Sequence, residues 1–312
     1  MTSFAAAMLI ALAIDAAIGW PDALYHRIGH PVTWLGALIT ALEARLNRAG
    51  LPRKRNGVIT CAAVLGAALL PALAITLTLP QGMFGTLITG ILAWPLVAAR
   101  SMYTHVADVA RPLAQGDLPA ARHAVSMIVG RDPSQLDTAG IARASLESLA
   151  ENTSDGIIAP LVWGAILGLP GIAAYKAINT LDSMIGHKTP RYQDFGWFSA
   201  RFDDWVNLPA ARLTGLLFAL ASPRAKIALA VMRRDARAHR SPNAGWPEAA
   251  MAGALNIRLS GPRIYENHIA QEPWLNPTAP DPDAQTIWQG LRLYLRALAL
   301  AAGLMAAMAI LA

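Results

Sequence analysis

One arginine and three carboxylates recur at helical spacing near the middle of the chain. Arg143, Glu147, Glu151 and Asp155 follow one another every four residues, which places them on one face of a predicted helix. An uncharged, mostly apolar segment follows directly. Because a charge is costly to remove from water, acids at this position are typical of a bound cation or a cationic substrate. The alternative is a solvated face on which Arg143 and Glu147 form an ordinary i,i+4 pair.

Ser148 and Asn152 add neutral oxygen donors beside this acidic face. A cluster rich in oxygen ligands, without sulfur or histidine, suits Mg²⁺ rather than zinc. The sequence therefore predicts a magnesium site or a site for a cationic group.

Three further polar blocks border apolar segments. The first, YKAINTLDSMIGHKTPRY at 175–192, crowds polar side chains into two helical turns and ends its helix at Gly186. The second, SARFDDWVNLPAARL at 199–213, places two adjacent aspartates that cannot both point the same way on a helix. The third, at 239–255, predicts a turn at 243–245 and a short helix from Pro247, whose free N–H groups attract anions. Membrane-adjacent ion pairs, a charge belt and a plain loop are the alternative interpretations of these blocks.

The elements that position these residues are predicted to be membrane helices. The chain of 312 residues is 54% hydrophobic and only 15% charged, which is outside the balance of a soluble domain. Its uncharged stretch at 56–99 is roughly twice the ~20 residues that cross a bilayer as a helix, and it is hinged at 79–82. We expect an all-α polytopic membrane protein with roughly four to six membrane segments, forming a single integral-membrane domain over 1–312. The predicted spans are 3–18, 57–79, 82–99, 156–175, 205–221 and 297–312.

The segment at 156–175 is predicted to be broken or re-entrant, because its prolines free backbone groups inside the membrane. The stretch at 100–155 is predicted to be helical, with breaks at 111–112 and 130–133, and β-structure has little support. The N-terminal apolar run lacks the basic flank of a secretory signal and is expected to be retained. The single cysteine, Cys61, excludes a disulfide framework and a cysteine-based metal site.

The net charge of +6 comes largely from basic clusters beside apolar segments, at 53–55 and 224–240. Orientation of the spans by the positive-inside rule explains this charge better than nucleic-acid binding does. The chain also lacks a complete phosphate-binding P-loop, a G-x-S-x-G elbow and an H-E-x-x-H motif. A standard P-loop ATPase and a serine hydrolase are therefore disfavoured.

Taken together, the polar blocks resemble one family, the adenosylcobinamide-phosphate synthases (CobD/CbiB) of cobalamin biosynthesis. The resemblance spans most of the chain and rests on long blocks in order: GHPVTWLG at 29–36, GRD at 130–132, ESLAENTSDGIIAPL at 147–161, the blocks at 175–192 and 200–213, and SPNAGWPEAAMAGAL at 241–255. One departure is an extra alanine in LPAARL, at Ala210 and Ala211, just before Arg212.

The resemblance implies a multi-pass protein of the cell (inner) membrane that is an ATP-dependent, amide-forming ligase. It would join aminopropanol phosphate to a propionate carboxyl of adenosylcobyric acid, in the lipid bilayer and beside other late enzymes of the pathway, with Mg²⁺ and ATP. Together with the charge spacing it assigns catalytic roles to Glu147, Glu151, Asp155, Lys176 and Asp182. The metal ligands assigned are Glu147, Glu151, Asp155, Asp182 and Asp204. The substrate-binding residues assigned are Arg131, Asn152, Tyr175, Asn179, Arg191, Tyr192, Arg201, Asn207, Arg212, Ser241 and Asn243.

Two other functions fit the same pattern of residues. A membrane transporter or scaffold would also use intramembrane carboxylates and broken helices, although no inverted repeat is present in the sequence. An intramembrane phosphotransferase could use an acidic cluster with Mg²⁺ on a lipid-linked alcohol.

Overall fold

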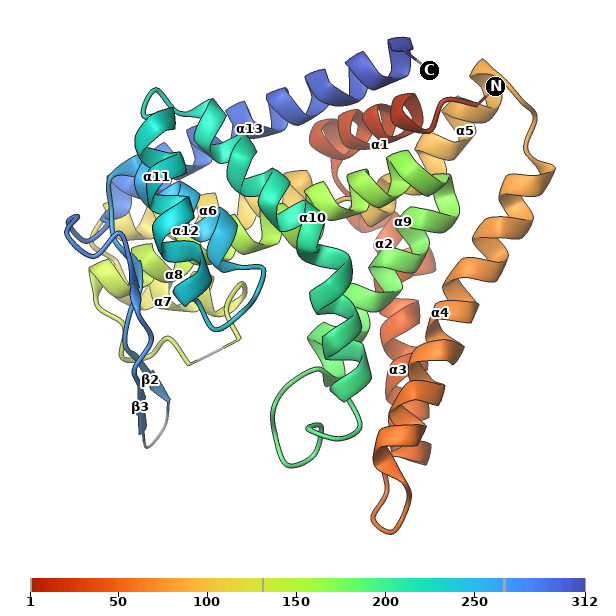
Figure 1. Cartoon of the computed structure of the whole chain (residues 1–312), viewed down its shortest axis with the longest axis horizontal. Helices are drawn as coiled ribbons and strands as arrows, with labels where there is room; N and C mark the ends of the chain where they lie inside the picture. Colours follow the sequence, from red (N-terminus) through yellow and green to blue (C-terminus); the bar gives the residue numbers. More distant parts are fainter. Residues whose placement is uncertain (1, 131, 266–267, 312) are drawn as a thin grey trace. The chain divides into compact units, whose positions relative to one another are not determined.

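The computed structural model describes residues 2–130, 132–265 and 268–311 (Figure 1). The chain is an all-α polytopic membrane protein, as predicted. Its packing divides it into two compact units. Unit 1 comprises Met1–Ala98, Ala159–Asn207 and Leu304–Ala312, and unit 2 comprises Ala99–Ile158 and Leu208–Gly303. The expected single integral-membrane domain stays a prediction, because this division does not decide which residues lie in the bilayer.

Unit 1 is built from the N-terminal helices and a long central one. Its elements are α1 Phe4–Ile18, α2 Asp22–Ile28, α3 Pro31–Leu46, α4 Arg53–Thr78, α5 Met83–Ala93, the short helix η1 Trp94–Leu96, α9 Ala159–Ile185 and the first part of α10 Trp197–Ala221. Helices α3, α4 and α9 pack around a buried cluster that includes Ile39, Cys61 and Leu181. Cys61 is therefore a small core residue.

Gly57 allows α4 to approach the chain segment that precedes α10. A Cβ atom at this position would lie 1.8 Å from the carbonyl oxygen of Phe195, closer than any van der Waals contact. Only a residue without a side chain fits this contact.

Unit 2 contains the shorter helices and the small strands. Its elements are α6 Ala99–Ala114, α7 Leu118–Ser126, α8 Thr138–Thr153, the π-helical turn η2 Ser154–Ile158, the rest of α10, α11 Ala225–Asp235, η3 Ala236–Ala238, α12 Gly245–Leu255, β1 Leu259–Ser260, β2 Arg263–Tyr265, β3 His268–Ala270, β4 Trp274–Leu275 and most of α13 Ala284–Leu311. Helix α8, which carries the acidic face, packs against α6, α7 and α12. The strands form two antiparallel ladders, β1 with β4 and β2 with β3.

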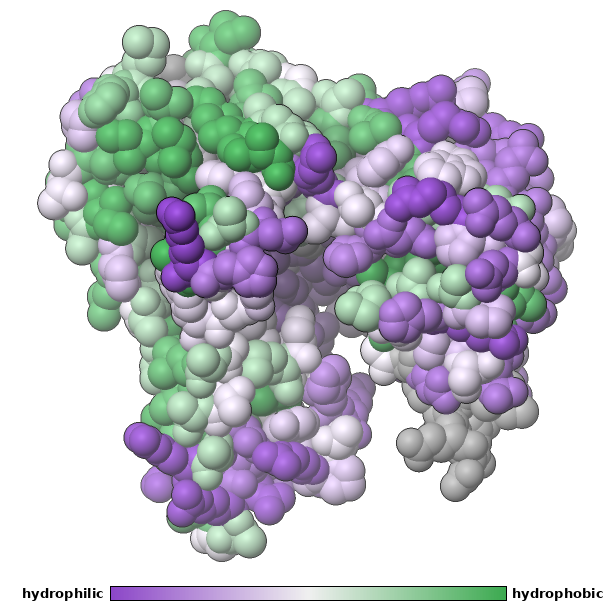
Figure 2. Space-filling view, turned by 180° about the vertical axis from the view of Figure 1, so that it is seen from behind, coloured by the Kyte–Doolittle hydropathy of each residue, from purple (hydrophilic) through white to green (hydrophobic). Residues whose placement is uncertain are grey.

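Four helical stretches are long and apolar enough to cross a membrane, and a fifth is counted if a bent pair forms one span. The four are Arg53–Thr78, Met83–Ala114, Thr138–Ile185 and Ala284–Leu311, and the bent pair is Phe4–Ile18 with Asp22–Leu46. They contain the predicted spans except 205–221, whose helix α10 is not among those found in the described residues. In Figure 2 hydrophobic side chains gather on unit 1 around the chain termini, where Met83 and Ile310 are almost fully exposed. This is the surface expected of a protein that faces lipid.

The predicted break in the 156–175 segment is confirmed at Gly168. Its φ of 68° lies in the left-handed region, so α9 consists of two helical parts joined there, shortly before Pro170. Whether the two parts re-enter the same side of a membrane stays a prediction.

One expectation about local structure is wrong. Helix α6 runs through Pro112 to Ala114 instead of breaking at 111–112, because a proline removes only one helical hydrogen bond and α6 is within a turn of its end. The expectation of little β-structure is confirmed, since the only strands in the described residues are the four short ones between 259 and 275.

Candidate functional site

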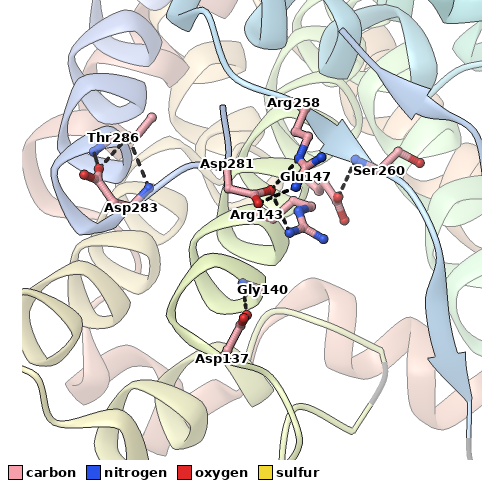
Figure 3. Close-up of polar contacts among 9 residues, drawn as sticks. All are labelled: Asp137, Gly140, Arg143, Glu147, Arg258, Ser260, Asp281, Asp283 and Thr286. Carbon is pink, nitrogen blue, oxygen red and sulfur yellow. Dashed lines mark hydrogen bonds and ion pairs between the residues drawn. The ribbon is translucent and has the colours of Figure 1, made fainter. Parts of the chain in front are cut away.

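The acidic face predicted on α8 is present, but its members differ in burial. Asp137 caps the helix by accepting a hydrogen bond from the Gly140 N–H at 2.7 Å (Figure 3). Glu147 is only 6% exposed, whereas Glu151, one turn later, is exposed. A solvated face therefore does not describe Glu147.

Glu147 connects α8 to the small β1–β4 ladder. Its Oε1 accepts a hydrogen bond from the Ser260 N–H at 2.7 Å, and Ser260 has a φ of 60° (Figure 3). A carboxylate bonded to a buried N–H is a strong, charge-assisted contact. Glu147 thus has a structural role that the sequence did not reveal.

Arg143 forms an ion pair with Asp281 of the same unit. The predicted alternative was an ordinary surface pair with Glu147. The Nη2 of Arg143 lies 3.0 Å from Oδ1 of Asp281, which also bonds to Arg258, and both guanidinium groups lie over the Trp274 ring at 4.7 and 4.4 Å from its centroid. The hydrogen bonds from Arg258, aided by Arg143, hold the pKa of Asp281 below its ordinary value. This arrangement, which we call the arginine clamp, fixes the chain at Arg258 and Asp281 to α8 (Figure 3).

The end of the acidic face lies on an irregular turn. Asp155 belongs to the π-helical turn η2, and π-turns occur often at functional sites. Asn152 donates hydrogen bonds to the backbone oxygen and the hydroxyl of Ser148, and Ser148 donates to the Ile128 carbonyl. The amide N–H donors of Asn152 are therefore engaged within the helix.

In unit 1 a polar cluster lies where α9 and α10 pack together. Tyr175 donates to Oδ1 of Asn207 at 2.7 Å, and Asn207 in turn donates to Oδ2 of Asp203 at 2.9 Å. Burial, followed by the negative charge of Asp182, raises the pKa of Asp203 to about 7, against the stabilising effect of Asn207 and Asn179. We call Tyr175, Asn179, Asp182, Asp203 and Asn207 the α9–α10 cluster.

Asp203 and Asp204 point in different directions, as predicted. Asp204 is partly exposed, and its carboxylate lies 3.9 Å from Arg201. Burial raises the pKa of Asp204, opposed by Arg201 and Lys188. The assignment of Asp204 as a metal ligand stays a prediction. Asp203 was considered beside it but was not assigned to the site, although its spacing of four from Asn207 was an available signal.

Arg191 is held by an acid that the sequence did not single out. Its Nε and Nη2 each lie 2.9 Å from an oxygen of Glu43, and its guanidinium lies 5.5 Å from the ring centroid of Tyr192. This bidentate pair ties the loop after α9 to α3.

Lys176, on α9, is half-buried.

The polar residues before α12 form a compact group in unit 2. Arg212 donates to Oδ1 of Asn243 at 2.9 Å and lies over the Trp246 ring, so the extra alanine does not remove it from this group. The Ser241 hydroxyl accepts hydrogen bonds from the Asn243 and Ala244 N–H groups, which organises the start of the helix. Helix α12 begins at Gly245, two residues before the predicted start.

A buried histidine and acid in the same region were missed. His239 Nε2 lies 3.7 Å from Oε2 of Glu248, and the two side chains are 4% and 2% exposed. The Nδ1 of His239 accepts a hydrogen bond from the Ser241 N–H, which directs the Nε2 proton toward Glu248. An acid in the first turn of a predicted helix was the available signal.

The predicted site residues are thus distributed over both units, and Arg131 lies outside the described residues. Among residues 2–130, 132–265 and 268–311, no three His, Cys, Asp or Glu side chains form a group that could hold a metal ion. The assignment of Glu147, Glu151, Asp155, Asp182 and Asp204 to Mg²⁺ therefore stays a prediction.

A protein-family model described as CobD/Cbib protein matches residues 8–294. The chain belongs to the CobD/CbiB family. The match confirms the resemblance drawn from the sequence blocks.

Relatives from three organisms cover nearly the whole chain and are called cobalamin biosynthesis protein CobD. One from Rhodobacter capsulatus is 68% identical, with 95% of each chain covered. One from a Sinorhizobium species is 47% identical, with 97% of each chain covered, and one from Brucella suis is 46% identical, with 96% of this chain and 94% of the relative covered. No solved structure matches the chain. This CobD/CbiB protein is thus related over nearly all of its length to proteins of cobalamin biosynthesis.

Proposed function

We propose that this CobD/CbiB protein is an adenosylcobinamide-phosphate synthase of the cell (inner) membrane. It would join aminopropanol phosphate to a propionate carboxyl of adenosylcobyric acid through an amide bond, using ATP. The observation that supports this most is the family match over residues 8–294, with relatives named for cobalamin biosynthesis. The lipid bilayer and other late membrane enzymes of the pathway are its expected partners.

The reaction needs an activated carboxyl, because a carboxylate and an ammonium do not condense in water. In the proposed sequence a propionate oxygen attacks the γ-phosphorus of ATP, the bond to ADP breaks, and an acyl phosphate forms. The amine nitrogen, after losing a proton, attacks the acyl carbon, and phosphate leaves with the bonding electron pair. Acid, amine and ATP thus give amide, ADP and phosphate.

The structure suggests how the predicted residues divide this work. The positive charges of Lys176 and Arg201, which lie on α9 and α10, are candidates to neutralise the charge of the phosphorylated reactants. Glu151, Asp155 and Asp182 are the candidate acceptors of the amine proton, because a carboxylate can act as a general base. The described carboxylates form no assembled metal group, so no step is assigned to protein-bound Mg²⁺.

The proposal is tested by an assay of the purified, detergent-solubilised protein. Adenosylcobyric acid, aminopropanol phosphate and Mg-ATP are supplied, and the corrinoid product is followed by mass spectrometry. We expect a product whose mass is the sum of acid and amine less one water, formed together with ADP. Absence of this product, or its formation at the same rate without ATP, would contradict the proposal.

The same assay separates the other two functions. A transporter or scaffold forms no amide under any condition. An intramembrane phosphotransferase transfers phosphate from ATP to a lipid-linked alcohol and leaves the corrinoid unchanged.

A further inference from the structure

The α9–α10 cluster contains a buried carboxylate oxygen that the described protein does not satisfy. Asp203 is 7% exposed, and its Oδ2 accepts a hydrogen bond from Asn207. Its Oδ1 is buried and accepts no hydrogen bond within the described part of the chain. Burying an ionised oxygen without a hydrogen-bond donor costs free energy, so the presence of such an oxygen requires an explanation.

The charged neighbours of Asp203 increase this cost, whereas the hydrogen bonds from Asn207 and Asn179 relieve part of it. The charge of Asp182, on α9, acts on Asp203 and disfavours its ionised form, as burial does. No positively charged side chain is among the groups that shift the pKa of Asp203. A cation from outside the chain would relieve both the burial of Oδ1 and the repulsion between the two acids.

Asn207 and Tyr175 hold Asp203 in one orientation. Asn207 is 1% exposed and Tyr175 is 2% exposed, and the chain of hydrogen bonds from the Tyr175 hydroxyl through Asn207 ends on Oδ2 of Asp203. Because Oδ2 is engaged in this way, Oδ1 is the oxygen left for a ligand. Asn179 and Asp182, which approach the same carboxylate, are half-buried.

We propose that Asp203 and Asp182 bind the primary ammonium group of the amine substrate. The identity of that amine, aminopropanol phosphate, rests on the proposed function. An ammonium carries three N–H donors, which match Oδ1 of Asp203, the Asp182 carboxylate and the amide oxygen of Asn179. A divalent metal fits this cluster less well, because only two acids belong to it and Mg²⁺ demands octahedral oxygen coordination.

Binding of two matched compounds tests this site without relying on catalysis. Titration calorimetry of the detergent-solubilised full chain at pH 8 compares aminopropanol phosphate with propan-2-yl phosphate, which lacks the amine. We expect the wild type to bind the amine at least 10-fold more tightly. Asp203→Asn should bring the two dissociation constants to within about 2-fold and leave that of propan-2-yl phosphate unchanged.

Asp194→Asn is the control, because it removes an exposed carboxylate from the loop before α10 in the same unit. It should keep the preference for the amine. If Asp203→Asn does not fold, as judged by gel filtration and circular dichroism, Asp182→Asn must show the same loss.

The proposal is overturned if the wild type shows no preference for the amine, or if a folded Asp203→Asn or Asp182→Asn protein keeps it. Failure of this proposal and failure of the proposed function are distinguishable. If the protein prefers the amine but forms no amide, the ammonium site is supported and the proposed ligase function is contradicted. If the protein forms the amide but both variants keep the preference for the amine, the proposed function is supported and the ammonium site is contradicted.

Discussion

The Asn207 amide lies one helical turn after Asp203 on α10 and donates a 2.9 Å hydrogen bond to its carboxylate. The Tyr175 hydroxyl on α9 holds Asn207 from the other side, at 2.7 Å. Together these contacts fix a buried acid between two helices of unit 1.

Asp203→Asn should weaken use of the amine more than use of ATP. Loss of the negative charge removes a contact to the ammonium, so the KM for aminopropanol phosphate should rise about 10-fold or more, a cost of about 1.4 kcal/mol or more. The KM for ATP should stay within about 2-fold. Steady-state kinetics of amide formation, with Asp194→Asn beside it, provides the measurement, and an equal rise in both constants would argue against ammonium binding.

Asp203 should also make stability depend on pH. Its pKa is about 7 in the folded protein and near its ordinary value of 3.8 in the unfolded chain. Between these values the folded protein keeps a proton that the unfolded chain has released, so stability falls as the pH rises through this window. Asp203→Asn does not lose stability in this way. The melting temperature of Asp203→Asn minus that of the wild type should therefore be larger at pH 8 than at pH 5. A difference that does not change with pH would contradict the raised pKa.

The same substitution, glutamate to glutamine, is expected to affect stability at Glu147 and activity at Glu151, one helical turn later. Glu147→Gln weakens the buried hydrogen bond from Ser260 and should cost about 1–3 kcal/mol of stability. Glu151→Gln changes an exposed side chain, so stability should move by less than about 0.5 kcal/mol while corrinoid amidation is lost. Melting temperatures and amide formation are measured for both variants. A fully active Glu151→Gln enzyme would remove Glu151 from the catalytic set.

The arginine clamp should hold the chain around residues 258–281 in place. Arg258, with Arg143, keeps the pKa of Asp281 below its ordinary value, so the stabilisation is present above about pH 4 and is lost as the pH falls through the lowered value. Asp281→Asn should make this segment more accessible, with little change in overall stability because the pair is partly exposed. Limited proteolysis at neutral pH is the measurement, and equal cleavage rates in variant and wild type would exclude the clamp's role.

Gly57 and Gly66 on α4 form a matched pair for the packing of unit 1. A Cβ at Gly57 would lie 1.8 Å from the Phe195 carbonyl oxygen, whereas nothing lies within 4 Å of a Cβ at Gly66. Gly57→Ala should destabilise the protein by about 3 kcal/mol through overpacking. Gly66→Ala should be neutral or slightly stabilising, because alanine favours a helix. Melting temperatures that fall equally for both variants would contradict the close contact.

The helices and the family could be predicted because their signals are local. An uncharged run at 56–99, interrupted at 79–82, leaves few alternatives to two apolar helices, and α4 and α5 occupy it. The helix end at Gly186 and the break near Pro170 are likewise properties of single residues. The ladder of Leu259 with Leu275 is not local, and its strands are too short to leave a periodic pattern.

The site was predicted only in part, because its contacts join distant segments. The acidic face of α8 follows from the spacing of four. The hydrogen bond from Ser260 to Glu147, however, joins residues 113 positions apart, and no sequence pattern indicates it. The same limit left Asp203 out of the predicted site. Adjacent helix residues point about 100° apart, and which of them meets α9 depends on tertiary packing.

Transfer of an oxygen isotope tests the central claim, ATP-dependent amide formation, most directly. Adenosylcobyric acid labelled with ¹⁸O in the reacting carboxyl is converted with aminopropanol phosphate and unlabelled Mg-ATP, and the released phosphate is analysed by mass spectrometry. The account predicts one ¹⁸O atom in each inorganic phosphate formed, because the acyl–oxygen bond breaks when phosphate leaves. Unlabelled phosphate, or label found in AMP, would contradict it.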